Sequence, residues 1–212
     1  HPDYTPPEAS DPLVPSMDFD TDMLDAKGHP FTVKGSPTIS TTIVKSGTGS
    51  LQFPNVNGAW DAHKLTSASS LGFLFPADFT IEAWIYLYDQ AEWNGWLSTG
   101  TTNAQFGRVR TNGMLSYNFG AGFGAVDMTG TVMAYNTWVH ACVERYNGVI
   151  RAYFNGTLGG NSLTNNNNWG DAVIEIGAGI AAGDNEHWRG HIDRLRIWKE
   201  ARYQHQNFTP QT

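Results

Sequence analysis

Tryptophans that stand near amide side chains are the residues of this sequence best suited to hold a ligand. The run Asn165 to Asn168 ends next to Trp169, and amide groups beside a flat apolar ring suit the hydroxyl edge and the C–H face of a sugar. The alternatives are an ordinary polar loop here and a core position for most of the other tryptophans. The candidate ligand-binding residues are Trp84, Trp93, Trp96, Asn167 and Trp169.

Aspartates in expected loops form a second group, and they suggest a structural calcium ion as a possible cofactor. Calcium takes about six to eight oxygen ligands, and irregular loops can add backbone carbonyls that paired strands cannot. The EF-hand motif is absent, because a loop begun at Asp18 has Met23 where the motif needs glycine. Acids that simply face water are the alternative. The candidate metal ligands are Asp22, Asp25, Asp184 and Asp193.

Acidic residues with the spacing of a catalytic pair are missing from the sequence. Glycoside hydrolysis needs two carboxylates that flank the scissile bond, whereas Glu82 and Glu175 each stand alone on an expected strand. Glu144 is expected to have Arg151 as its partner across a hairpin. No Gly-x-Ser-x-Gly elbow occurs either. We therefore predict that the protein is not an enzyme, and we keep a glycosidase as an alternative.

The segment from Trp138 to Gly156 predicts the centre of the scaffold. Asn147-Gly148 suits a type I′ turn, which needs positive φ at both positions, so the segment is predicted to be a hairpin. This turn sets Glu144 opposite Arg151. One face of the hairpin is apolar and is expected to enter the core: Val139, Ala141, Val143, Ile150, Ala152 and Phe154. The other face is mixed, and any function of the hairpin is expected there: Trp138, His140, Cys142, Glu144, Tyr146, Val149, Arg151 and Tyr153.

Two further patterns predict strands that precede this hairpin in the sequence. Residues 80–87 alternate cleanly, with Ile81, Ala83, Ile85 and Leu87 on the inward face. A second hairpin is predicted at Asn112-Gly113, and its register sets Arg108 opposite Tyr117.

The last expected strand contains an irregularity. Ile192 and Leu195 are three positions apart, whereas strand alternation needs an even spacing. A β-bulge is therefore predicted near Asp193, and it would aim this side chain at a specific place.

Bulk composition limits the class of protein. Thirteen basic and 20 acidic residues give a formal net charge of −7 with no Lys/Arg cluster, which argues against nucleic acid as a partner. No run of about 18 apolar residues occurs, so no membrane span is expected. The single cysteine, Cys142, leaves no intrachain disulfide. Residues 1–16 hold five prolines and are predicted to be an extended arm or linker outside any ladder, with one domain over residues 17–212.

Four segments together resemble the laminin-G-like, concanavalin A-like jelly roll. They are DFTIEAWIYL, WVHACVERYNGVIRAYFNG, IEIG and WRGHIDRLRIWKEAR, in that order. The resemblance covers nearly the whole chain from about Met17 onward. It implies an all-β fold, a jelly-roll sandwich of two antiparallel sheets. It does not fix the function, because related domains bind glycans, bind proteins or decorate larger assemblies.

The C-terminal stretch ARYQHQNFTP also resembles the ending of such domains in bacteriophage structural proteins. We therefore expect a non-catalytic virion module, attached to other virion proteins through its N-terminal arm and part of a homo-oligomer or larger assembly. The alternative is a carbohydrate-binding, lectin-like module that recognises a cell-surface or polysaccharide glycan. The expected location is the virion in the first case, and secreted or at a cell surface in the second.

Overall fold

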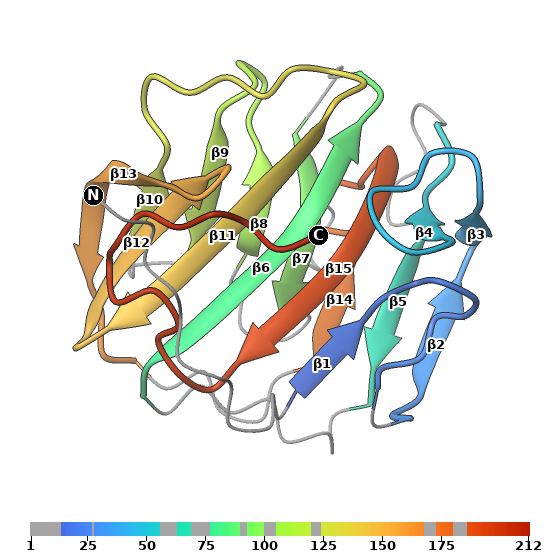
Figure 1. The fold of residues 1–212 in the computed structure, drawn as a ribbon, viewed down its shortest axis with the longest axis horizontal. Helices are drawn as coiled ribbons and strands as arrows, with labels where there is room; N and C mark the ends of the chain where they lie inside the picture. The colour runs from blue at the N-terminus through green and yellow to red at the C-terminus, as the bar shows by residue number, and fades with distance from the viewer. Residues whose placement is uncertain are drawn as a thin grey trace.

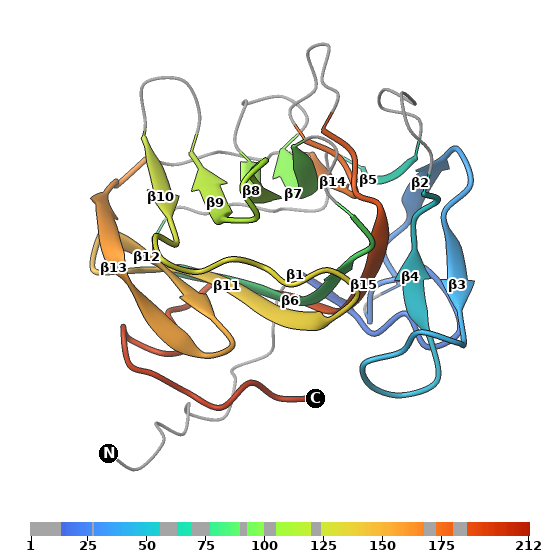
Figure 2. The same ribbon diagram turned by 90° about the horizontal axis from the view of Figure 1, so that it is seen from above.

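The computed structural model describes residues 14–26, 28–55, 63–68, 77–89, 93–99, 105–119, 124–167, 173–179 and 186–212. Trp169, Asp184 and residues 1–13 of the predicted arm lie outside the described residues. The described part of the chain contains β-strands and no helix. The strands form two antiparallel sheets that face each other (Figure 2). The predicted all-β jelly-roll sandwich is confirmed.

The first sheet has eight strands (Figure 1). Along the sheet they follow in the order β13 (Thr157–Thr164), β12 (Val149–Phe154), β11 (Trp138–Tyr146), β6 (Phe79–Leu87), β15 (Gly190–Trp198), β4 (Ser50–Gln52) and β3 (Thr38–Ser40), with β1 (Val14–Met17) also paired to β15.

The second sheet has seven strands. Their order is β10 (Ala125–Asp127), β9 (Leu115–Asn118), β8 (Gln105–Val109), β7 (Asn94–Thr99), β14 (Ile174–Ile176), β5 (Lys64–Ser67) and β2 (Phe31–Lys34).

The predicted central hairpin is present as β11 and β12. Asn147 and Gly148 have φ angles of 51° and 74°, as the type I′ turn requires. Glu144 pairs with Arg151, and the pairing continues without a shift to Ala141 opposite Phe154. The side chains predicted to face inward on this hairpin and on β6 lie in the core or, for Phe154, pack against it.

The predicted register of the second hairpin is wrong by one residue. Arg108 of β8 pairs with Ser116 of β9 rather than with Tyr117. The loop consists of residues 111–113, one residue longer than a type I′ loop, and Gly113 has a φ of 79°. A three-residue loop that ends in a left-handed glycine is a common alternative for hairpins, and the sequence Asn-Gly fits both loops.

The last residues of the predicted N-terminal arm belong to a strand. β1 starts at Val14, which pairs with Ile197 of β15, and the register shifts between Val14 and Ser16. The shift lies at Pro15, which has no backbone N–H to donate to the ladder. The expectation that residues 1–16 stay out of the sheets is therefore wrong for Val14 to Ser16, whereas the division into arm and domain stays a prediction.

Residues 199–212, the C-terminal segment, cross the outer face of the eight-stranded sheet (Figure 1, red). Tyr203 and Phe208 stack with their rings 3° from parallel, and both pack against Cys142 and Tyr153. This segment therefore buries part of the mixed hairpin face, on which any function of the hairpin was expected.

Glu144 ties this segment to the sheet. Its side chain is fully buried and accepts hydrogen bonds from the backbone N–H groups of Tyr203 (2.6 Å) and His205 (3.1 Å). The hydroxyl of Tyr153 (3.0 Å) also donates to it. The Thr80 hydroxyl lies 3.2 Å from it and donates its proton to the nearer Glu200 carbonyl (2.8 Å). The carboxylate is thus bonded to the C-terminal segment and not, as predicted, to Arg151.

Candidate functional site

The outer face of the eight-stranded sheet, meaning the side of β6, β11 and β15 that points away from the seven-stranded sheet, carries an aromatic platform. The platform consists of Tyr86, Tyr88, Trp138 and His191. Trp138 stands opposite Tyr86 in the ladder, with ring centroids 5.4 Å apart. Tyr86 also lies 5.9 Å from Tyr88 and 5.6 Å from His191. Tyr86, Tyr88 and Trp138 are half-buried, so part of each ring is open to solvent.

A directed chain of hydrogen bonds fixes the polar groups of this platform. The Ser50 hydroxyl donates to the carbonyl of Ile43 (2.7 Å), so it must accept from His191 Nδ1 (2.9 Å). His191 Nε2 then accepts from the Tyr88 hydroxyl (2.6 Å), whose oxygen accepts from the Gln52 amide (3.0 Å). Burial lowers the pKa of His191 to about 4, so the imidazole is neutral near pH 7, as this chain requires.

Next to the platform lies a pocket of about 130 Å³, the Trp84 pocket. Its lining residues come from the three central strands and from the end of the C-terminal segment. They are Glu82, Trp84, His140, Arg194, Arg196, Trp198, Gln211 and Thr212.

Glu82 is the acid of this pocket. It accepts hydrogen bonds from the Tyr203 hydroxyl (2.5 Å) and from the indole N–H of Trp198 (3.2 Å). His140 Nε2 lies 3.4 Å from its Oε2. Burial alone would raise the pKa of Glu82, but His140 and the other two donors outweigh it and hold the pKa below the ordinary value.

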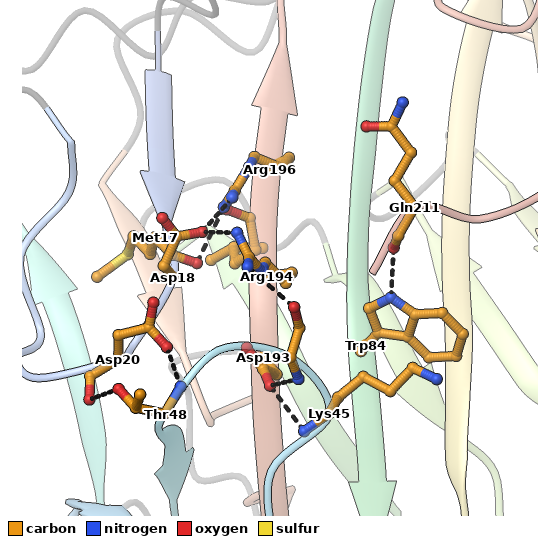
Figure 3. A network of polar contacts seen from close by, with 12 residues as sticks. Met17, Asp18, Asp20, Lys45, Thr48, Trp84, Asp193, Arg194, Arg196 and Gln211 are labelled. Atoms are coloured by element: carbon orange, nitrogen blue, oxygen red, sulfur yellow. Dashed lines mark hydrogen bonds and ion pairs between the residues drawn. The ribbon is translucent and has the colours of Figure 1, made fainter. Parts of the chain in front are cut away.

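Two arginines form one wall of the pocket and are held by an acid outside it. Arg194 Nη1 lies 2.8 Å from Asp18 Oδ1, and Arg196 contacts the same oxygen (Figure 3). Burial works against this charge, but the two guanidinium groups keep the pKa of Asp18 below its ordinary value. The two arginine side chains of this wall are therefore charged, and Asp18 holds them in position.

Trp84 is covered on two sides. The ammonium of Lys45 lies 3.9 Å from the centre of its ring, and its indole N–H donates to the backbone carbonyl of Gln211 (2.8 Å) (Figure 3). Only 8% of the residue is exposed. The indole is therefore close to solvent but not open to it.

The bulge predicted near Asp193 is present beside this pocket. Pairing of β15 with β6 shifts between Asp193 and Arg196, and Arg194 has a φ of 51°. Asp193 is fully buried, and its Oδ2 accepts the backbone N–H groups of Lys45 and Ser46, both at 3.0 Å. Burial raises the pKa of Asp193 to about 6. The bulge thus anchors the loop that places Lys45 over Trp84.

The structure separates the predicted ligand-binding residues. Trp84 lines the pocket, whereas Trp96 is fully buried in the core. Trp93 immediately precedes β7 of the other sheet, with the guanidinium of Arg108 4.3 Å from its ring centre. The backbone carbonyl of Asn167 accepts a hydrogen bond from Nη1 of the buried Arg145 side chain (2.7 Å). A site that contains Trp84, Trp93 and Asn167 together is therefore not formed.

Of the predicted calcium ligands, Asp22 and Asp25 line one pocket, whereas Asp193 lies on β15. Among the described residues, no group of three acidic, histidine or cysteine side chains could hold a metal. Asp22 accepts a backbone N–H within its own loop, at Leu24 (2.9 Å). Asp25 Oδ2 lies 2.5 Å from the Nδ1 of His29. Asp193 Oδ2 accepts the backbone N–H groups of Lys45 and Ser46. A structural calcium ion stays a prediction.

The aromatic platform is the part that the sequence prediction missed as a ligand site. Tyr86 and Trp138 had been placed on outward faces, and Trp138 was on the face where function was expected. Their meeting depends on the pairing of β6 with β11, which joins segments about 50 residues apart and has no local turn to set the register. In the sequence, the only indication of the platform is that both strands carry aromatic residues at outward positions.

Comparison with known proteins identifies the family and supports the fold. Residues 45–206 match the family model Laminin_G_3, described as the concanavalin A-like lectin/glucanases superfamily. No curated protein sequence matches significantly. Similar solved structures include the binding domain of Paraclostridial Mosquitocidal Protein 1, with 15% identity and a TM-score of 0.66 over 89% of this chain and 49% of that one.

Two other similar structures carry the same fold. Domain 4 of AbnA, a GH43 extracellular arabinanase from Geobacillus stearothermophilus in complex with arabinotriose, has 18% identity and a TM-score of 0.64, covering 88% of this chain and 92% of that one. The receptor binding domain of botulinum neurotoxin C/D mosaic serotype has 13% identity and a TM-score of 0.65, covering 88% and 48%. The chain thus spans about half the length of the two toxin domains. At 13% to 18% sequence identity, these similarities show a shared fold and nothing further.

The prediction of a bacteriophage virion module is wrong in the light of these matches. The similar structures are toxin binding domains and an arabinanase domain seen with a saccharide, and they favour the carbohydrate-binding alternative. The short C-terminal stretch that suggested a virion is accounted for by packing, since it forms the segment that covers the outer face. In the described part of the chain, no helix is long and apolar enough to cross a membrane.

Proposed function

Because the chain belongs to the concanavalin A-like lectin/glucanase superfamily, we propose that it is a carbohydrate-binding module whose binding surface is the aromatic platform. The observation that carries this proposal is the pair Tyr86 and Trp138, two half-buried rings 5.4 Å apart on a rigid sheet. Rings of this kind supply apolar contact area at low entropic cost, because each has only two rotatable side-chain bonds. They suit the C–H face of a sugar ring.

The polar rim of the platform supports the same function. A sugar offers hydroxyls that both donate and accept, so its site needs side chains held in a known orientation. The Tyr88 hydroxyl and the Gln52 amide are oriented by the hydrogen-bond chain through His191. Preorganised groups lose little conformational entropy on binding.

A binding role is proposed in place of catalysis. Hydrolysis of a glycosidic bond needs two carboxylates at the bond, and Glu82 is the one acid that lines the Trp84 pocket. Glu144, on the neighbouring strand β11, is fully buried under the C-terminal segment. We also propose a secreted or cell-surface location, since a carbohydrate-binding module meets its glycans there.

A glycan array tests this function. The wild-type chain and Trp138→Ala are applied to the same array of plant, bacterial and animal glycans, with Trp93→Ala as the matched control. Trp93 is also half-buried but lies directly before β7, a strand of the other sheet. We expect hits for the wild type and the control that Trp138→Ala loses. An array without wild-type hits would overturn the proposal.

A further inference from the structure

We propose that the Trp84 pocket is a covered second subsite, which takes the next sugar of an oligosaccharide once Lys45 and residues 211–212 move aside. This inference rests on the proposed function of the platform. It assigns a ligand class, a neutral oligosaccharide of at least three units, and it makes the cover a determinant of chain-length preference.

The position of the pocket fits such a subsite. Trp84 and Tyr86 are two residues apart on the same face of β6, which corresponds to roughly 7 Å along a strand. On β11, His140 and Trp138 have the same relation and stand opposite them in the ladder. A saccharide that lies on the platform along these strands reaches the pocket with its next unit.

The interior of the pocket has polar groups suited to sugar hydroxyls. Glu82 offers acceptor oxygens, and Arg194 is a donor in the lining, with its Nε free of a hydrogen-bond partner among the described residues. His140 is 4% exposed, and its Nδ1 is buried without a hydrogen-bond partner among the described residues. The Nε2 of the same ring lies 3.4 Å from Glu82 Oε2, so His140 adds an imidazole to the lining beside the acid.

The first part of the cover is the side chain of Lys45. It occupies the face of the Trp84 ring, 3.9 Å from the centre, where a sugar would stack. Its backbone is fixed by Asp193, but the side chain itself is half-buried and flexible in its four-carbon stem. Rotation of Lys45 therefore frees the ring without disturbing the loop.

The second part of the cover is the end of the C-terminal segment. Tyr203 and Phe208 are buried, and the chain between them is held by Glu144, so this part is an anchor. Gln211 and Thr212 are exposed, and the Gln211 carbonyl accepts the indole N–H of Trp84. A ligand hydroxyl could accept the same hydrogen bond, so the peptide occupies a position that a sugar can take.

Two variants that open the cover test this inference. Lys45→Ala frees the ring face and keeps the backbone bond to Asp193. Deletion of residues 211–212 frees the indole N–H. Lys34→Ala is the matched control, because it removes the same charge from an exposed position in the other sheet. Uncovering is measured without ligand as a shift of the Trp84 indole N–H resonance, which Trp84→Phe identifies by its loss.

Binding is then measured on an array of saccharides from one to six units. We expect both opened variants to bind trisaccharides and longer glycans at least about tenfold more tightly than the wild type, with disaccharide binding unchanged. Adding Trp84→Phe to either variant should abolish the gain. Equal affinities at every length for the opened variants and the wild type would overturn the inference.

The outcomes separate this inference from the proposed function. If the wild type binds short glycans through Trp138 and opening changes nothing, the platform stands and the covered subsite fails. If only the opened variants bind, and do so through Trp84, the subsite stands and the platform fails. If neither the wild type nor the opened variants bind any glycan, both are wrong.

Discussion

Trp138 and Tyr86 stand opposite each other on β11 and β6, with ring centroids 5.4 Å apart and their planes tilted by 59°. Each ring alone would be an ordinary outward aromatic residue on a sheet. Side by side, and flanked by Tyr88 and His191, they form a surface with a fixed shape. The account of function given above depends on this pair.

Gly148→Val is expected to destabilise the domain by roughly 1 to 3 kcal/mol. Gly148 has a φ of 74°, which a β-branched residue avoids, and an added Cβ would meet the side chain of Asn166. Urea unfolding measures the change. Asn147→Gly, which tolerates positive φ at the neighbouring position, is the control and should cost much less. An unchanged unfolding midpoint for the valine variant would contradict the assigned turn.

Cys142 is expected to be unreactive in the folded protein. It is fully buried, and burial, together with the charges of Glu82 and Glu144, raises its pKa well above the ordinary value. A thiol reagent at neutral pH should label the native protein slowly and the urea-unfolded protein quickly. Rapid labelling of the native state would show that the C-terminal segment does not cover this strand.

Glu144→Gln is expected to destabilise the fold by about 1 to 3 kcal/mol, because an amide N–H₂ would then face groups that donate. The carboxylate accepts hydrogen bonds from the Tyr153 hydroxyl and from two backbone N–H groups of the C-terminal segment. Thermal unfolding and hydrogen exchange of residues 203–205 provide the measurement. Glu200→Gln, a half-buried acid beside Arg202, is the control. If both variants melt together with the wild type, Glu144 does not hold the segment.

His191 is expected to make stability fall as the pH falls from about 6.5 toward 4. Its pKa is about 4 in the fold, against 6.5 as the ordinary value, so the unfolded chain takes up the proton first in this range. The neutral His191 therefore makes its full contribution to the free energy of unfolding above pH 6.5. On acidification the free energy of unfolding falls, through this group, by at most about 1.4 kcal/mol per pH unit.

The comparison of wild type with His191→Gln isolates this effect. Asp193 has the opposite sign, since burial raises its pKa to about 6 and its ionisation lowers stability as the pH rises toward that value. The Asp193 effect is common to both proteins and cancels in the difference. Unfolding free energies measured from pH 4 to 7 should diverge between the two proteins, and parallel curves would contradict the buried neutral imidazole.

The sequence predicted the parts of the fold that local chemistry decides. The register of β11 and β12 follows from one turn, and the bulge at Asp193 follows from an odd spacing of apolar residues. The register of β8 and β9 was wrong because Asn112-Gly113 suits two loop lengths.

The candidate site was harder to predict, because it depends on contacts between distant segments. The pairing of β6 with β11 makes the platform, and the C-terminal segment buries Glu144 and covers part of the outer face. Neither contact has a local turn or a periodic pattern that fixes it in the sequence. The sequence indicated outward aromatic residues such as Trp138, but it did not indicate which residues of other strands lie beside them.

Calorimetric titration of the best array ligand into wild type, Trp138→Ala and Trp93→Ala tests the central claim most directly. If the platform binds glycans, Trp138→Ala weakens binding by at least about tenfold, while Trp93→Ala and the wild type bind alike and all three unfold at similar temperatures. If Trp138→Ala binds as tightly as the wild type, the aromatic platform is not the glycan site.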